Sequence, residues 1–93
     1  MQIDAPRKPD RTYLTVLAKI DQTGLMEPAE IIWPDGRNFH IDKVECWRKA
    51  RDHEPETTYY AIRIKDQRRI LYFTQSPKCS IVNMGRWYVE SAH

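Results

Sequence analysis

A short segment, residues 31–41, constrains the fold more than any other part of the chain. It reads IIWPDGRNFHI, with an apolar run on either side of Pro34-Asp35-Gly36. Proline presets φ at the first central position of a turn, aspartate suits the second, and glycine adopts a positive φ at no steric cost. The segment therefore predicts a β-hairpin in which Gly36 has a left-handed conformation and closes a type I turn with a bulge.

The length and the charge distribution of the chain limit its class. Its 93 residues allow one domain with one modest core. The formal net charge of +2 is too small to require a polyanionic partner. Residues 1–56 carry nine Lys/Arg against eleven Asp/Glu, whereas residues 57–93 carry six against two. The positive surplus therefore belongs to the C-terminal part of the chain.

No targeting or redox motif is recognisable. The chain begins with Met1, shows no secretory leader, and has no apolar run near the ~20 residues that cross a bilayer. Its two cysteines, Cys46 and Cys79, form no Cys-x-x-Cys pair. We therefore expect a cytoplasmic protein with two free thiols, of which Cys46 is buried as a small hydrophobe.

Alternating apolar residues and turn signals predict five or six short strands. The first eleven residues contain Pro6 and Pro9 among charged residues, which predicts a flexible N-terminal arm over 1–11. Residues 12–93 are then a single small all-β domain, an antiparallel SH3-like barrel or rolled sheet. The expected strands are Thr12–Ile20, Glu27–Trp33, Arg37–Arg51, Thr57–Lys65, Arg69–Gln75 and Trp87–Glu90.

The third of these strands contains a shift of phase. Phe39 and Ile41 are apolar at odd positions, whereas Val44 and Cys46 are apolar at even positions. Because a shift of one residue turns every side chain to the other face, we expect a β-bulge or a sharp bend near residues 42–43. A helix over residues 43–53 is the alternative, but its apolar stripe is thin and no capping residue precedes it.

The hairpin over residues 57–75 carries the best candidate for a binding surface. A two-residue turn at Asp66-Gln67 would place Lys65 opposite Arg68, and a four-residue loop would shift the partners but not the faces. Either way, one face is the apolar set Tyr60, Ile62, Ile64, Leu71 and Phe73. The opposite face mixes aromatic, apolar and cationic residues with no acid: Tyr59, Arg63, Lys65, Arg68, Ile70 and Tyr72.

Aromatic rings interleaved with cations suit a phosphate backbone whose bases can stack, and small barrels bind nucleic acids on such faces. The candidate binding residues are therefore Tyr59, Arg63, Lys65, Arg68 and Tyr72. The simpler alternative is that these are ordinary outward residues whose arginine stems cover apolar surface. A third alternative is a protein partner that adds a strand to an unpaired edge or covers an apolar strip.

No catalytic or metal-binding motif is recognisable. A site built from His40, Cys46, His53 and Cys79 is conceivable in three dimensions, but the histidines lack ligand spacing and suit outward strand and loop positions. The serines lack a Gly-x-Ser-x-Gly elbow, the three glycines are isolated, and carboxylates this dense in loops are usually solvated. We therefore expect a protein that is not an enzyme and has no metal and no cofactor.

Several motifs resemble one family. The run Pro28-x-x-Ile31-x-Trp33-x-Asp35-Gly36-Arg37-x-Phe39-x-Ile41-Asp42-x-Val44, together with Tyr60-x-x-Arg63-Ile64 and the closing residues 85–90, resembles an uncharacterised family of short bacterial β-barrel proteins. The resemblance spans residues 15–90 and departs from the pattern at residues 76–83. Some members are similar to proteins encoded near error-prone repair polymerases, which implies a role linked to DNA.

These observations favour a small, non-enzymatic binding module. The first hypothesis is weak binding of single-stranded nucleic acid, accessory to DNA repair, through the Tyr59 and Arg63 face. The second is a protein partner held at an edge strand or an apolar strip. The two differ in their salt dependence, because only binding through phosphates weakens steeply with salt.

Overall fold

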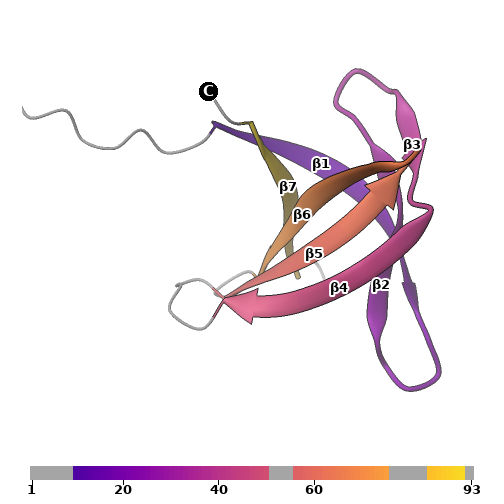
Figure 1. Cartoon of the computed structure of the whole chain (residues 1–93). Helices are drawn as coiled ribbons and strands as arrows, with labels where there is room; N and C mark the ends of the chain where they lie inside the picture. Colours follow the sequence, from indigo (N-terminus) through magenta and orange to yellow (C-terminus); the bar gives the residue numbers. More distant parts are fainter. Residues whose placement is uncertain (1–9, 51–55, 76–83, 92–93) are drawn as a thin grey trace, which may run out of the picture.

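The fold is a single sheet of seven antiparallel strands, seen in a computed structural model that describes residues 10–50, 56–75 and 84–91. Figure 1 shows the sheet curling into a half-barrel. Its order is β3-β2-β1-β7-β6-β5-β4. The strands are β1 (Asp10–Ile20), β2 (Met26–Ile32), β3 (Asn38–His40), β4 (Lys43–Ala50), β5 (Thr57–Ile64), β6 (Gln67–Gln75) and β7 (Gly85–Ser91).

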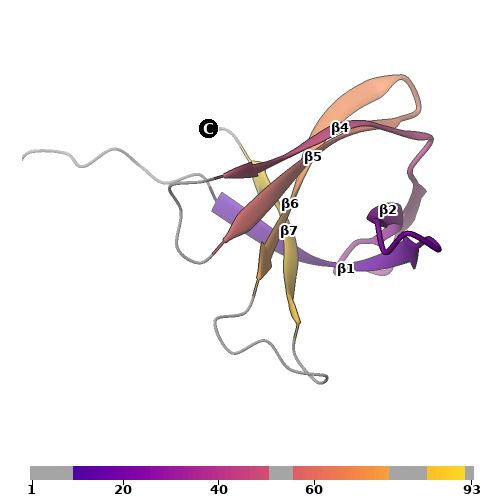
Figure 2. The same ribbon diagram turned by 90° about the horizontal axis from the view of Figure 1, so that it is seen from below.

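Strand β1 belongs to both halves of the curl. Its first part, Asp10 to Leu14, pairs with β7, and its second part, Thr15 to Ile20, pairs with β2. The change of partner turns the β1–β2 hairpin away from the plane of β7, β6 and β5 (Figure 2). Strand β1 begins two residues earlier than the sequence pattern predicts; the rest of the predicted N-terminal arm, residues 1–9, lies outside the described residues.

The predicted bend in the third strand is confirmed, and it raises the number of strands to seven. Ile41 donates a backbone hydrogen bond to Ala29 of β2 at 3.0 Å, and Asp42 donates one to Arg63 of β5 at 2.9 Å. Two residues thus join the two edges of the sheet, β3 and β4. Residues 43–50 form a strand, so the helical alternative is wrong there; residues 51–53 lie outside the described residues.

A second irregularity in β4 overturns the expected burial of Cys46. The pairing of β4 with β5 shifts between Val44 and Cys46, because Glu45 is an extra residue in the ladder. The shift places Cys46 opposite Ala61, on the face away from the core, and its side chain is exposed. The expectation of a buried thiol at this position was therefore wrong.

The hairpin turns follow from backbone conformation. Gly36 has φ +95°, as predicted, and the loop is closed by hydrogen bonds from Gly36 to Trp33 and from Trp33 to Arg37, both 2.8 Å. The next turn differs from expectation. Lys65 and Asp66 have φ of +47° and +65°, which is the pattern of a two-residue type I′ turn. The turn thus lies one residue earlier than Asp66-Gln67.

The earlier turn changes the partners of the β5–β6 hairpin but not its faces. Arg63 lies opposite Arg68, and Tyr60 lies opposite Leu71. The face predicted to be apolar is the one that packs into the core, because strands expose alternate residues to opposite sides.

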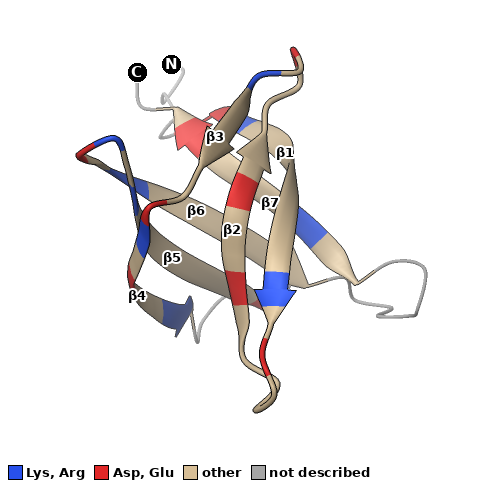
Figure 3. Cartoon of the chain, turned by 90° about the vertical axis from the view of Figure 1, so that its right-hand side faces the viewer, with Lys and Arg blue, Asp and Glu red and all other residues tan. Residues whose placement is uncertain are grey.

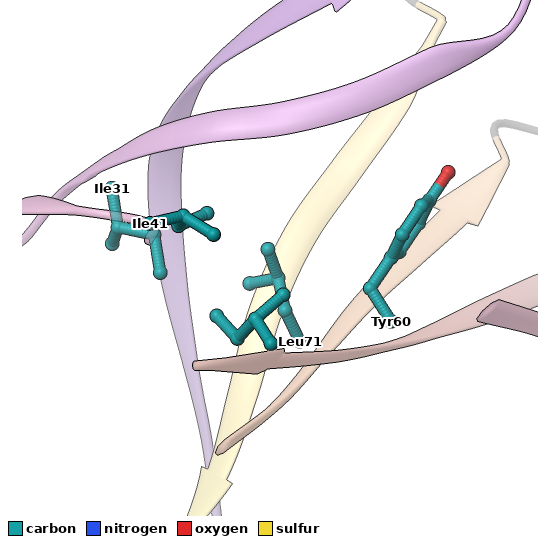
Figure 4. Close-up of a cluster of buried hydrophobic side chains, with 5 residues drawn as sticks. Ile31, Ile41, Tyr60 and Leu71 are labelled. Atoms are coloured by element: carbon teal, nitrogen blue, oxygen red, sulfur yellow. The ribbon is translucent and has the colours of Figure 1, made fainter. Parts of the chain in front are cut away.

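The core lies in the concave side of the curl. Ile62 of β5 and Leu71 of β6 are fully buried, and Ile31, Ile41 and Tyr60 pack with them. Figure 4 shows these side chains converging from β2, from the β3–β4 bend and from β5 and β6. Burial raises the pKa of Tyr60, with a smaller contribution from the charge of Glu27. We call this side of the sheet the inner face and the opposite side the outer face.

Candidate functional site

Four tyrosines from four neighbouring strands form a row across the outer face. Tyr13 of β1 lies opposite Tyr88 of β7, Tyr88 opposite Tyr72 of β6, and Tyr72 opposite Tyr59 of β5. Directly opposed residues share one face of a sheet. Tyr59 precedes the buried Tyr60 in β5, so the row points away from the core. We call these residues the tyrosine row.

The rings of the row contact one another without a gap. The ring centroids of Tyr72 and Tyr88 are 5.0 Å apart with planes at 6°, which is a stacked pair. Tyr59 meets Tyr72 at 5.2 Å and 81°, and Tyr13 meets Tyr88 at 5.6 Å and 61°. Tyr88 retains 3% exposure, whereas Tyr13 at the end of the row retains 39%. The row is therefore continuous, and its Tyr13 end is exposed whereas Tyr88 within it is buried.

Arginines sit on the tyrosine rings. The guanidinium carbon of Arg86 lies 3.5 Å from the ring centroid of Tyr13, and that of Arg11 lies 4.5 Å from the centroid of Tyr88. Arg48 of β4 is directly opposite Tyr59 at the other end of the row. The Arg86–Tyr13 and Arg11–Tyr88 pairs are cation–π contacts, which suit the flat, weakly hydrated guanidinium better than an ammonium group. Each end of the row thus carries a fixed cation or has one beside it.

A glutamate anchors the middle of the row. The hydroxyl of Tyr72 donates a hydrogen bond to Glu90, and desolvation together with this carboxylate raises the pKa of Tyr72 to about 12. Glu90 also lies 3.9 Å from Nε of Arg11. A phenol with this pKa is neutral at physiological pH, so Tyr72 acts here as a hydrogen-bond donor and not as an acid.

The arginines predicted from the hairpin are less free than expected. Arg63 and Arg68 face each other across β5 and β6, and both lie beside Glu45, at 3.5 and 3.7 Å. The hairpin's own residues on this face include no acid, as predicted, but the β4 bulge adds Glu45 beside them. Lys65 is in the turn, where its backbone N–H donates to Asp42, and it does not belong to the face.

The outer face is basic as a whole. Over β4 to β7 and the first half of β1, it carries Arg11, Lys43, Arg48, Arg63, Arg68 and Arg86 against Glu45 and Glu90, a formal charge of +4. Figure 3 shows that the charged positions of β2 are acidic, whereas β4 and the β5–β6 turn are mostly basic. All of these cations except Lys43 are arginines, the residue that binds phosphate through two parallel N–H bonds and also stacks on rings.

Tyr59 and Tyr72 are predicted from the sequence of the 57–75 hairpin, but Tyr13 and Tyr88, the other half of the row, are not. Arg11-Thr12-Tyr13 and Arg86-Trp87-Tyr88 are two copies of an Arg-x-Tyr pattern, and period 2 places the arginine and the tyrosine on the same face. This repeat is the signal that would have shown them. Their proximity depends on the pairing of the first strand with the last.

The described residues hold no candidate metal site. No cluster of three or more His, Cys, Asp or Glu side chains suited to a metal occurs in residues 10–50, 56–75 and 84–91. His53 and Cys79, two members of the conceivable metal site, lie outside those residues. No helix in the described part of the chain is long and apolar enough to span a membrane.

Searches for relatives of this chain find no match among protein-family models, curated proteins or solved structures.

Proposed function

We propose that the protein is a non-enzymatic module that binds single-stranded nucleic acid on its outer face. The observation that carries the proposal is the tyrosine row with arginines on and beside its rings, on a face with a formal charge of +4. A positively charged groove or face supplies the affinity for phosphates, and aromatic groups accept bases of any sequence. The resemblance to proteins encoded near error-prone repair polymerases favours DNA as the nucleic acid.

The contacts within the row distinguish the roles of its tyrosines. Tyr72 and Tyr88 cover each other's faces, so a base finds little free ring surface between them. Tyr59 ends the row on one side, and at the other side the guanidinium of Arg86 lies over Tyr13. A base can stack on a guanidinium plane as well as on a ring. Tyr59 and the Arg86–Tyr13 pair are thus the stacking positions, and Tyr72 and Tyr88 hold them in place.

Phosphates are assigned to the arginines that are least neutralised. Arg48 and Arg86 have no acidic side chain within ion-pair distance among the described residues. Arg63 and Arg68 share Glu45, and Lys65 lies in the turn, so these three contribute a weaker and longer-range attraction. Contacts to about three phosphates give a slope of log affinity against log salt of roughly −2 for a single strand.

The test is a titration of a fluorescent oligothymidine at several salt concentrations. We expect micromolar affinity near about 50 mM salt and the slope given above. Tyr59→Ala weakens binding by about 1–3 kcal/mol if a base stacks there, and Arg86→Ala also makes the slope shallower. Arg37→Ala is the matched control, because it removes an exposed arginine that pairs with Asp35 in a distant turn. No binding at low salt, or equal losses in all three variants, refutes the proposal.

A protein partner is the second candidate, favoured by one observation. Strand β4 is an edge of the sheet, and its Trp47 is 49% exposed. An extended segment from another protein can add to such an edge through main-chain hydrogen bonds. Binding of this kind depends little on salt and is lost in Trp47→Ser, whereas the oligonucleotide titration is unaffected by that change. The SH3-like arrangement of the strands that the sequence predicts stays a prediction.

A further inference from the structure

The β1–β2 hairpin forms an arm that extends away from the other strands (Figures 1 and 3). We define the arm as residues 17–30, from the second half of β1 through the turn to β2. Leu17, Ile20 and Leu25 are 50%, 63% and 38% exposed. Three of the seven large hydrophobic side chains that are exposed in the described residues therefore lie on this one short hairpin. Apolar side chains gathered in this way mark an interaction site more often than single exposed ones do.

The turn of the arm is held in one shape. The Asp21 carboxylate accepts hydrogen bonds from the N–H of Thr23 at 2.8 Å, from the Thr23 hydroxyl at 2.6 Å and from the N–H of Leu25 at 3.1 Å. The backbone N–H of Asp21 also donates a hydrogen bond to the carbonyl oxygen of Leu25, at 3.0 Å. These bonds keep the pKa of Asp21 below its ordinary value. The apolar side chains are thus presented by a preorganised turn, which lowers the entropy cost of docking.

The arm and the outer face are complementary. The arm carries Asp21, Glu27 and Glu30 against Lys19, a formal charge of −2, whereas the outer face over β4 to β7 and the first half of β1 carries +4. The outer face also offers exposed apolar surface at Tyr13 and Ile70, each 39% exposed. Acidic charge disfavours docking of the arm on an anionic membrane or on nucleic acid. Every other copy of this chain therefore presents a surface that suits the arm, because its outer face is basic and partly apolar.

We propose that the arm of one molecule docks on the outer face of a second copy, with Glu27 and Glu30 beside arginines and Leu17 on the apolar surface. The contact joins two different surfaces, so it is head-to-tail and leaves one arm and one face free at the ends. It covers the tyrosine row, so self-association and the proposed nucleic-acid binding exclude each other. Only this last consequence rests on the proposed function.

Charge reversal of each surface tests the contact. Glu27→Lys with Glu30→Lys changes the arm from −2 to +2, and Arg48→Glu with Arg86→Glu changes the face from +4 to 0. Mass is measured by light scattering at about 100 µM protein in low and high salt, with circular dichroism to confirm folding. We expect the unaltered chain to associate at low salt, each variant alone to be monomeric, and their mixture to associate again.

Each outcome decides the proposal. Restoration in the mixture supports it, because the intact arm of the face variant then meets the intact face of the arm variant. A monomeric wild-type chain at low salt overturns it, as does a mixture that stays monomeric, since the arm then docks elsewhere. Association that is insensitive to salt and to both charge reversals also overturns it, and points to the β4 edge instead. Oligothymidine plays no part in these measurements, so a failure of nucleic-acid binding is a separate result.

Discussion

The two faces of strands β5, β6 and β7 both carry aromatic rings, but their rings are covered in different ways. On the inner face, the curl of the sheet brings other strands over the side chains, and Leu71 has no exposed surface. On the outer face, the rings cover one another, and guanidinium groups lie over Tyr13 and Tyr88. The inner cover consists of apolar side chains, whereas the outer cover includes charged groups.

The two kinds of cover contribute differently to the free energy of folding. Removing water from the inner face is the main source of folding free energy, because the hydrophobic effect scales with the apolar area buried. Tyrosine pairs and cation–π contacts on an exposed face contribute less. The outer face thus tolerates exchange of its arginine contacts without unfolding, which a binding surface requires.

The largest expected effect is on the inner face. Leu71→Ala removes a fully buried side chain and leaves a cavity beside Ile62, so we expect a loss of about 2–5 kcal/mol in the free energy of unfolding. Urea denaturation measures the loss. Ile70→Ala is the matched control, because the adjacent Ile70 points to the outer face and is 39% exposed. Equal losses at the two positions would show that the two faces do not differ as described.

A smaller effect is expected where β7 begins. Gly85 has φ +156°, and a Cβ there would lie 2.5 Å from the carbonyl oxygen of Thr74 and 2.7 Å from the ring of Phe73, an inner-face residue. Gly85→Ala therefore forces β6 and β7 apart, and we expect a loss of about 1–3 kcal/mol. Gly24→Ala is the comparison, because nothing lies within 4 Å of its added Cβ, although its φ of +87° still strains an alanine. Denaturation midpoints of the two variants decide whether the steric contact adds to the backbone effect.

A third prediction concerns the outer cover itself. Arg86→Ala removes the guanidinium over Tyr13, and an exposed cation–π contact contributes about 0.5–1 kcal/mol. We therefore expect little change in urea stability alongside a clear loss of oligonucleotide affinity. A variant that unfolds as readily as Leu71→Ala would mean that the arginine is part of the structural core and not an exchangeable cover.

The inner face was predictable from the sequence because it depends on local patterns. Alternation placed Tyr60, Ile62 and Leu71 on one side, and the change of phase after Ile41 located the bend that joins β3 to β4. Both signals are read within a few residues, and neither depends on the register between strands.

The outer face was only partly predictable. The β5–β6 turn contains no glycine, so the sequence does not show that Lys65 and Asp66 adopt positive φ, and the register was misplaced. The bulge that exposes Cys46 and brings Glu45 beside Arg63 has no glycine signal either. Tyr13 and Tyr88 meet only because the two ends of the domain pair, which is a long-range contact that local periodicity does not contain.

The smallest effect at neutral pH, and the last prediction, compares one tyrosine from each face. Burial raises the pKa of Tyr60, and burial with the Glu90 hydrogen bond raises that of Tyr72 from 10.0 to about 12. For each phenol the folded state favours the neutral form, so its contribution to stability is complete below the unfolded pKa. That contribution is lost as the pH rises through the folded pKa. For Tyr72 this window runs from about pH 10 to about pH 12.

Tyr72→Phe removes the titrating hydroxyl and keeps the ring stacked on Tyr88. We expect urea stability to fall less steeply between about pH 10 and about pH 12 than in the unaltered chain, and ultraviolet titration to lose its latest-ionising phenol. Tyr60→Phe is the inner-face counterpart and also flattens the fall, since its pKa is raised as well. If Tyr60→Phe makes urea stability less dependent on pH in this window but Tyr72→Phe does not, only the inner face excludes water. The stacked tyrosines of the outer face would then be open to solvent.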